Sequence, residues 1–311
     1  MIRGFLFLGI IASIVISVVS YGKRTKRPDH VSMIVDTDCG YGVDDLFALT
    51  RLLIDPAKNP EAIFSTHFNF ADRSNDSTME TSHLMISRIL ALHTLPELPN
   101  LEGSANPIAN RDKVKPQASP ASDYLLNRIT KVPYGRKIDV VTLGAPTNLA
   151  SAILIDSTIA DKIRWYCLGL QFDSQDRIWN KNEFNTRNDL DAMDYLLNLN
   201  NLETHIMPVN VAGSVKIHIQ EAKDMLDGRG LKWELMLERW EETAPDRLEV
   251  ELSALMLIEA ILNPDLVTEK KLKPPPENLY RDVFVYTWID KKKVMRDFRD
   301  AASLSMGDVS R

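Results

Sequence analysis

The chain is poor in cysteine and has no excess of positive charge. Only Cys39 and Cys167 occur among 311 residues, so a disulfide framework cannot hold the fold together. The two could pair if their strands adjoin, but two buried thiols are the simpler expectation. The net charge is −6 and the isoelectric point is about 5.6. With no basic stripe beyond residues 21–31, this charge argues against nucleic acid as a partner.

The sequence also lacks internal repeats, low-complexity tracts and a Pro- or Gly-rich linker. We therefore predict one domain over residues 32–311. Its composition, 44% apolar and 26% charged over the chain, is that of an ordinary globular protein with a sizeable core. The lysines within residues 270–273 and 291–293 are expected to lie on solvated faces.

The first 20 residues read as a targeting segment. Arg3 precedes an uncharged apolar run over residues 4–19, which is short for a membrane-spanning helix and suits a signal peptide. The basic linker that follows, residues 21–31, is typical of a signal anchor. Both alternatives stay open. Either one directs the protein to the secretory pathway: cleavage gives a secreted protein, and retention anchors it in a membrane through residues 4–19.

Four carboxylates lie close together near the start of the domain. Residues 33–35 form a β-prone run, Gly40 and Gly42 permit a tight turn, and apolar residues recur with helical spacing over 46–53. The carboxylates between strand and helix are Asp36, Asp38, Asp44 and Asp45. Charges so close must be offset by a divalent cation, by helix-terminal N–H groups or by raised pKa values. We interpret the cluster as a cation site; the simpler alternative is that the last two only cap the helix.

Strands and helices alternate along the rest of the chain. The predicted strands cover residues 62–68, 163–170, 205–211 and 283–287, the last as an edge strand. The predicted helices cover residues 76–92 with Leu84 inward, 122–129, 192–199, 221–240 with a break at Gly228 and Gly230, and 248–262. Residues 138–154 repeat the strand, turn and helix. This order predicts an α/β fold with a mainly parallel, open sheet covered by helices.

Polar side chains follow two more of these strands. A helix opens near Thr147 after one strand, and Glu183 and Asn185 follow another. Because the carboxyl ends of parallel strands meet at one edge, we expect these groups to lie beside the carboxylate cluster. Their oxygen atoms suit a hard cation and a polyhydroxylated ligand.

Three segments, in this order and spacing, resemble the inosine-uridine preferring nucleoside hydrolase family. Residues 36–45 (DTDCGYGVDD) are similar to its N-terminal Asp-rich motif, 144–150 (GAPTNLA) to its Gly-Pro-Leu-Thr-Asn segment, and 183–185 (EFN) to its Glu-Phe-Asn motif. The resemblance spans most of the chain. It implies an N-glycosidase that hydrolyses purine or pyrimidine ribonucleosides. Its partner would be a small nucleoside, and homo-oligomers occur in the family.

The resemblance also implies a role for each site residue. Asp38 and Asp45 would bind Ca²⁺ together with the backbone carbonyl of Thr147, and Asp38 would be the general base. The substrate would be held by Asp44 and Asn185 at ribose hydroxyls, by Glu183 at the 5′ side, and by Asn69 in a ribose loop. Ca²⁺ would lower the pKa of a bound water, and nearby carboxylates would stabilise the oxocarbenium-like transition state.

The sequence departs from the family pattern near its C-terminus. The family usually places a His-Asp pair in a late helix, but Ser253 and Ala254 stand there and no histidine follows His218. Glu251 could replace the missing calcium ligand if the helix shifts, although a surface glutamate is the simpler expectation. An alternative function is therefore a catalytically impaired protein that still binds a nucleoside or another partner.

Other features leave further alternatives open. Asp36-Thr-Asp38 superficially resembles the Asp-x-Asp nucleophile of haloacid dehalogenase-type phosphohydrolases, although that family does not explain the Glu-Phe-Asn segment. Arg177 stands where the nucleoside hydrolases usually have an asparagine. Without the histidine, Trp165 or Trp179 could assist the leaving base by stacking, but each is more often a core or lid residue.

Overall fold

The structure is a computed structural model that describes residues 32–69, 78–108, 114–226 and 228–304. The predicted leader and basic linker, residues 1–31, lie outside the described residues. Within the described ranges, no helix is both long and apolar enough to cross a membrane. Cys39 and Cys167 are both buried free thiols, which confirms the simpler expectation.

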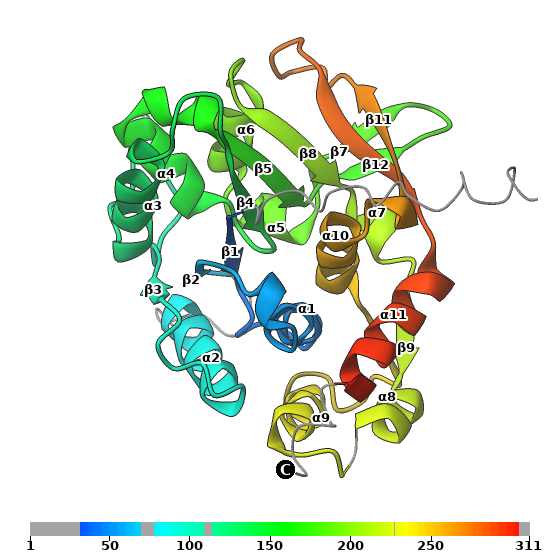
Figure 1. The fold of residues 1–311 in the computed structure, drawn as a ribbon. Helices are drawn as coiled ribbons and strands as arrows, with labels where there is room; N and C mark the ends of the chain where they lie inside the picture. The colour runs from blue at the N-terminus through cyan, green and yellow to red at the C-terminus, as the bar shows by residue number, and fades with distance from the viewer. Residues whose placement is uncertain (1–31, 70–77, 109–113, 227, 305–311) are drawn as a thin grey trace, which may run out of the picture. The chain divides into compact units, whose positions relative to one another are not determined.

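An eight-stranded sheet forms the centre of the domain (Figure 1). Its strands, in spatial order, are β11 (Val267–Leu272), β12 (Val283–Ile289), β8 (Glu203–Met207), β5 (Ile163–Leu168), β4 (Ile138–Thr142), β1 (Met33–Thr37), β2 (Ala62–Ser65) and β3 (Asn100–Glu102). Only β11 runs antiparallel to its neighbour; the other neighbours pair in parallel. The predicted α/β fold with a mainly parallel open sheet is confirmed.

Helices cover both faces of this sheet (Figure 1). The described helices are α1 (Asp44–Leu53), α2 (Thr78–Leu92), α3 (Pro120–Thr130), α4 (Thr147–Ile155), α5 (Phe184–Asn188), α6 (Leu190–Leu197), α7 (Val209–Ala212), α8 (Ile219–Leu226), α9 (Leu231–Thr243), α10 (Ser253–Leu262) and α11 (Lys291–Leu304). Side chains alternate along a strand, so Met33 and Val35 face one core and Ile34 faces the other. The first core contains α1, α2 and α8 to α11, and the second contains α3, α4 and α6.

Residues 216–251 leave the main sheet on a stem of two short antiparallel strands, β9 (Lys216–His218) and β10 (Glu249–Glu251). Helices α8 and α9 lie between these strands, and the predicted break between them is confirmed. Gly230 takes a φ of +103° there, a conformation that glycine adopts without steric cost. Helix α9 packs against α1 and α2. We call residues 216–251 the α8–α9 excursion; it brings α9 beside α1 and α2.

Some sequence predictions are wrong in detail. Strand β12 is interior, because β11 pairs with its outer side and forms the edge. The helix predicted from residue 248 begins only at Ser253, since residues 249–251 pair with β9. Leu84 on α2 is 68% exposed rather than inward. The strand predicted over 163–170 ends at Leu168, and a small hairpin follows, β6 (Gln171–Asp173) and β7 (Ile178–Asn180).

A charged cluster lies on the sheet across β12, between side chains of β8 and β11. The Nδ1 atom of His205 is 2.6 Å from Oε1 of Glu269, and its Nε2 atom is 3.2 Å from Oε1 of Glu203. Burial by itself lowers the pKa of His205, but the hydrogen bonds and charges of the two glutamates outweigh burial and raise it above its usual value. The two glutamates therefore favour the protonated form of this imidazole.

Candidate active site

The carboxyl edge of the sheet gathers the predicted site residues. Asp38 follows β1, Asp45 lies in the first turn of α1, and the Glu183–Asn185 segment begins α5 after the β6–β7 hairpin. All four of the side chains Asp38, Asp45, Glu183 and Asn185 are buried, the first two to 4% and 5% exposure. The structure thus brings the Asp-rich and Glu-Phe-Asn segments to the same edge, as the parallel topology predicted.

The backbone after β4 also contacts the cluster, at Gly144. A Cβ atom placed on Gly144 would lie 2.8 Å from Cγ of Asp38 and 2.7 Å from Cγ2 of Thr66. No side chain fits into so small a gap, so only glycine allows this loop to approach Asp38. The turn between β4 and α4 therefore lies directly beside Asp38, as the third predicted segment at this edge of the sheet.

Asp38 and Asp45 form a carboxylate pair in which each side chain shifts the pKa of the other. Burial is the largest cause that raises the pKa of both groups, and the charge of Asp44 raises them further. Thr37 Oγ1 donates to Oδ2 of Asp45 at 2.8 Å. In contrast, Oδ2 of Asp38 is buried without a hydrogen-bond partner among the described residues. A buried oxygen without a partner costs free energy unless a ligand or water satisfies it.

Asp44 is held by a different element. Its carboxylate accepts a hydrogen bond from the backbone N–H of Ala254 in the first turn of α10, which lowers its pKa. Burial is the larger effect, and the pKa of Asp44 rises to about 6. The N-terminus of α10 therefore supplies a helix-terminal N–H group that offsets the negative charge of Asp44, one of the three means expected from the sequence.

Glu251 does not replace the missing calcium ligand in this structure. It is an exposed residue of β10, and Oε1 lies 3.7 Å from Nζ of Lys216. Its charge reaches Asp44 only as a repulsion that raises the pKa of that group. The expectation of a surface glutamate is confirmed.

Asp36, the remaining carboxylate of the cluster, has a structural role. Both of its oxygens accept from Nδ2 of Asn148, at 3.1 Å and 3.2 Å, and the same amide donates to the carbonyl of Ser65 at 3.2 Å. The Oδ1 atom of Asn148 accepts from the backbone N–H of Ser104 at 2.8 Å. Asn148 thus ties β1, β2 and α4 to the segment after β3, and Asp36 is part of that tie.

Glu183 and Asn185 hold the carboxyl edge together. Glu183 caps α5: its carboxylate accepts from the backbone N–H groups of Asn185 at 3.0 Å and of Thr186 at 2.9 Å. The Nδ2 atom of Asn185 donates to the carbonyls of Leu143 at 2.6 Å and Leu168 at 3.1 Å, at the ends of β4 and β5. These contacts fix α5 beside the carboxylates; substrate binding by the two residues stays a prediction.

Thr147 takes part in a buried hydrogen-bonded chain that sequence reasoning missed. Its Oγ1 donates to Oδ2 of Asp189 at 2.6 Å and lies 2.9 Å from Nε2 of His67. Since the hydroxyl hydrogen is used by Asp189, His67 donates through Nε2. Burial lowers the pKa of His67 to about 4, so this ring is neutral at pH 7. The carbonyl of Thr147 as a cation ligand stays a prediction.

Asn69 lies at the same edge, with an exposed side chain. Its backbone N–H donates to Oδ1 of Asn188 at 2.9 Å, which joins the segment after β2 to α5. The preceding residue, Phe68, donates from its N–H to Oγ1 of Thr78 at 3.2 Å. The backbone around Asn69 is therefore held, while its amide is presented to solvent.

Three aromatic rings from three segments lie together beside the carboxylates. Tyr41 is 37% exposed and stacks on Phe184, with ring centroids 4.3 Å apart and planes at 25°. Phe68 contacts the Tyr41 ring edge-on at 5.5 Å. These contacts join the loop after β1, the segment after β2 and the start of α5.

The two tryptophans considered for base stacking have other contacts. Trp165 is fully buried and its Nε1 donates to Oγ1 of Thr142 at 2.9 Å, so it is a core residue. Trp179 packs on Phe172, and its Nε1 donates to the carbonyl of Lys273 at 3.0 Å. Arg177 lies in the turn of the β6–β7 hairpin with a φ of +59°.

The donor set at the edge fits a hard cation in part. In the described ranges of the chain, no three His, Cys, Asp or Glu side chains converge as metal ligands. Asp38 and Asp45 nevertheless meet, and one buried oxygen of Asp38 lacks a partner. Hard cations such as Ca²⁺ also accept backbone carbonyl and water oxygens. The pair could therefore hold such an ion only with oxygens of that kind completing its coordination.

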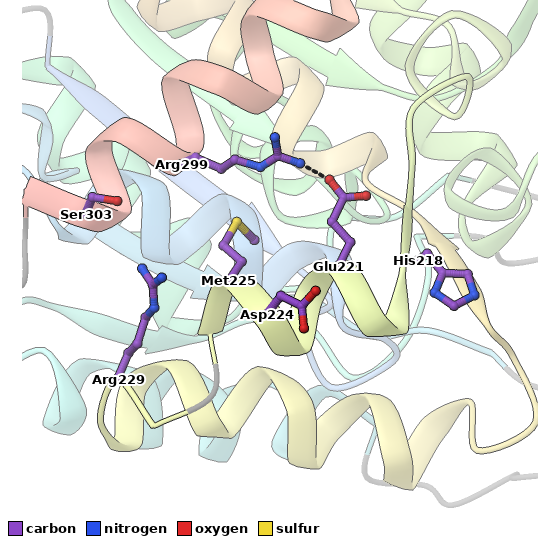
Figure 2. A pocket seen from close by; sticks show the side chains of 7 residues that line it. All are labelled: His218, Glu221, Asp224, Met225, Arg229, Arg299 and Ser303. Carbon is purple, nitrogen blue, oxygen red and sulfur yellow. Dashed lines mark hydrogen bonds and ion pairs between the residues drawn. The ribbon is translucent and has the colours of Figure 1, made fainter.

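A cavity of about 470 Å³ lies away from this edge, between α8 and α11 (Figure 2). Its lining residues are His218, Glu221, Asp224, Met225, Arg229, Arg299 and Ser303. An ion pair between Arg299 and Glu221 crosses it. The cavity shares no residue with the carboxylate cluster, so it does not bear on the predicted chemistry.

Comparison with known proteins is consistent with this geometry. A family model described as "Inosine-uridine preferring nucleoside hydrolase" matches residues 33–273. No curated protein matches the sequence.

Several solved structures share the fold. A plant nucleoside hydrolase has a TM-score of 0.68 at 17% identity, with 88% of this chain and 99% of that one covered. A purine-preferring ribonucleoside hydrolase from Gardnerella vaginalis has a TM-score of 0.65 at 20% identity, with the same coverage. An inosine-uridine preferring nucleoside hydrolase from Bacillus anthracis has a TM-score of 0.60 at 16% identity, over 89% of this chain and 99% of that one.

Proposed function

The chain belongs to the inosine-uridine preferring nucleoside hydrolase family, and from this premise we propose that it is a Ca²⁺-dependent ribonucleoside hydrolase. It would cleave the N-glycosidic bond of purine or pyrimidine nucleosides. Family membership supports nucleoside hydrolysis as the general activity. The observation that carries the proposal is the buried Asp38–Asp45 pair, with one carboxylate oxygen left without a partner.

Each site residue has a defined task in this proposal. A Ca²⁺ held by Asp38 and Asp45 would acidify and orient the attacking water. Asp38 would accept the proton of that water. Positive charge develops on the ribose as the bond to the base breaks. The half-buried carboxylate of Asp44 and the buried carboxylate of Glu183 stabilise this charge.

Departure of the base is the step that this chain supports least. Ser253 and Ala254 carry no acidic or imidazole group, and the N–H of Ala254 is used by Asp44. Loss of a general acid costs about 10²- to 10⁴-fold in rate. Turnover should therefore be slow for bases that need a proton, and much less impaired for a leaving group that is stable as an anion.

The proposal is tested by calorimetry with Ca²⁺ and by chromatography of ribose release from inosine, uridine and adenosine. The riboside p-nitrophenyl β-D-ribofuranoside serves as the substrate that needs no acid. We expect Ca²⁺ binding and ribose release, with the nitrophenyl substrate fastest. Asp38→Ala should abolish both, while Asp265→Ala, an exposed aspartate outside the site, should change neither.

Other outcomes would redirect the assignment. Turnover retained by Asp38→Ala would contradict the role of that residue. Ca²⁺ binding without release from any of the four substrates would indicate the catalytically impaired binding protein, which the Ser253–Ala254 segment makes the second candidate.

For location we propose the secretory pathway, on the basis of the apolar run over residues 4–19 and the basic segment after it. Mass spectrometry of the N-terminus of the exported protein tests this. A mature start near residue 21 indicates a secreted protein, and an intact leader indicates membrane anchoring. Retention of the protein in the cytosol would contradict the proposal.

A further inference from the structure

The loop that begins with Asp38 and leads to Asp44 and Asp45, residues 38–43, is held from two sides. On one side it is pressed against α2: the backbone N–H of Gly40 lies 3.4 Å from Oγ of Ser82, and Sγ of Cys39 lies 3.6 Å from the carbonyl of Ser82. A Cβ atom on Gly40 would come within 2.8 Å of the Ser82 nitrogen. On the other side, Nη2 of Arg239 on α9 donates to the carbonyl of Gly40.

Arg239 is an unusual residue for its position. Its side chain is only 13% exposed, and Nη1 donates to Oε2 of Glu242 at 3.0 Å. Its Nε atom is buried with no partner among the described residues. Burying a guanidinium with one donor unsatisfied costs free energy. The ion pair with Glu242 and the contact with Gly40, which lies 199 residues away in sequence, offset this cost.

The loop contains one turn, closed by a hydrogen bond from the N–H of Tyr41 to the carbonyl of Asp38 at 2.8 Å, and otherwise depends on contacts with other elements. It has no regular secondary structure between β1 and α1, and Gly40 and Gly42 lose more conformational entropy on folding than other residues would. None of the described ion pairs includes Asp38, Asp44 or Asp45, whose mutual repulsion would otherwise open the loop. The charge of Arg239 reaches the loop, since it favours the anionic form of the Cys39 thiol.

We propose that Arg239 is a positioning residue: it clamps the carbonyl of Gly40 from the α8–α9 excursion and so holds Asp38 against Asp45. The clamp is a property of the folded chain. Its consequence for a cation rests on the proposed function, because that function places Ca²⁺ at the pair. The two parts are therefore measured separately.

The clamp is tested by the reactivity of Cys39, a residue of the loop whose side chain is completely buried. A thiol reagent modifies the metal-free protein, and mass spectrometry separates Cys39 from Cys167. We expect Arg239→Met to speed the labelling of Cys39 by at least about tenfold, the effect that loss of one hydrogen bond to a charged group has on a local opening equilibrium. Labelling of Cys167, deep in the other core, should not change.

The matched control is Glu238→Gln, one position earlier on α9. Glu238 pairs with Arg88 of α2 at 2.5 Å on an exposed surface, so this variant loosens α9 without touching the loop. It should label like the wild type. Arg239→Lys keeps the charge and one donor and should lie between the wild type and Arg239→Met.

The consequence is measured by calorimetry with Ca²⁺. Removing a positive charge near carboxylates would by itself tighten cation binding. Loss of positioning predicts the opposite, and we expect Kd to rise by about 10- to 100-fold in Arg239→Met, as for other residues that orient ligands of a metal. The sign of the change therefore distinguishes positioning from charge alone.

Unchanged Cys39 labelling would overturn the clamp, and so would equal acceleration at Cys39 and Cys167, which indicates general destabilisation. Unchanged or tighter Ca²⁺ binding in Arg239→Met would overturn the positioning role. If the wild type binds no Ca²⁺, the proposed function loses its cation, and Cys39 labelling still decides the clamp. If Arg239→Met does not fold, the same comparison is made with Arg239→Lys.

Discussion

A buried ion pair joins α1, which carries Asp44 and Asp45, to α10, whose N-terminus contacts Asp44. Arg51 on α1 is 4% exposed and Glu259 on α10 is fully buried, with Nε and Oε1 2.5 Å apart. The other oxygen, Oε2 of Glu259, accepts from Nδ2 of Asn263 at 3.0 Å. The two helices pack along each other. Glu259→Gln should therefore leave the Arg51 guanidinium buried without a counter-charge.

The expected cost follows from this burial. Removing one partner of a buried pair destabilises a protein by about 3–5 kcal/mol, because the remaining charge keeps its desolvation penalty. Replacing both partners removes that penalty. The double variant Arg51→Met/Glu259→Leu should thus lie within about 2 kcal/mol of the wild type, including about 1 kcal/mol for the lost bond from Asn263.

Urea unfolding followed by tryptophan fluorescence measures these differences. With a slope of about 3 kcal/mol per molar urea, Glu259→Gln should lower the midpoint by about 1–1.7 M. Under the proposed function, the same variant should weaken Ca²⁺ binding, since α1 carries Asp45 and the N-terminus of α10 holds Asp44. A loss below about 1 kcal/mol, or a double variant as unstable as the single one, would refute the reasoning.

Two further predictions follow from the sheet and from the turn after β4. The pKa of His205 is raised in the folded state, so its contribution to stability is fully present below the pKa of unfolded histidine and is lost as pH rises through the raised value. His205→Gln should cost more at pH 6 than at pH 9 in urea unfolding; an equal cost would contradict the pairing with the two glutamates. Gly144→Ala should displace Asp38 and weaken Ca²⁺ binding at least about tenfold while circular dichroism stays unchanged. Gly42→Ala, where an added Cβ meets nothing closer than 3.5 Å, is its control, and equal Ca²⁺ binding by both variants would contradict the steric argument.

Local sequence patterns predicted most of the architecture. Alternating apolar runs and helical periodicities located β1, α1, β4 and α4, and glycines predicted the break between α8 and α9. The local sequence pattern was less informative for segments whose strand partner lies far away in the sequence. Residues 249–251 look like the start of a helix, but they pair with β9 because the excursion returns beside its own beginning. The polar strand β11 is the sheet edge, a position its lysine-rich sequence tolerates because one side faces solvent.

The sequence located the candidate site but did not predict which aspartate has which role. Four aspartates in ten residues indicated one cluster, and the structure divides them into different roles. Asp36 is satisfied by Asn148 and Asp44 by the backbone of Ala254, whereas Asp38 keeps an oxygen without a partner. His67 carried no sequence signal, because its neutral state depends on burial against Thr147.

By itself, the sequence determined the strands and helices of the central units, such as β1, α1, β4 and α4, and predicted that three polar loops meet at one sheet edge. These properties follow from side-chain periodicity and from the common direction of parallel strands. Only the tertiary structure decided which carboxylate is available to a ligand and which residue clamps its loop. A hydrogen-bond partner is set by proximity in space, and partners here lie far apart in the chain: Arg239 and Gly40 are separated by 199 residues.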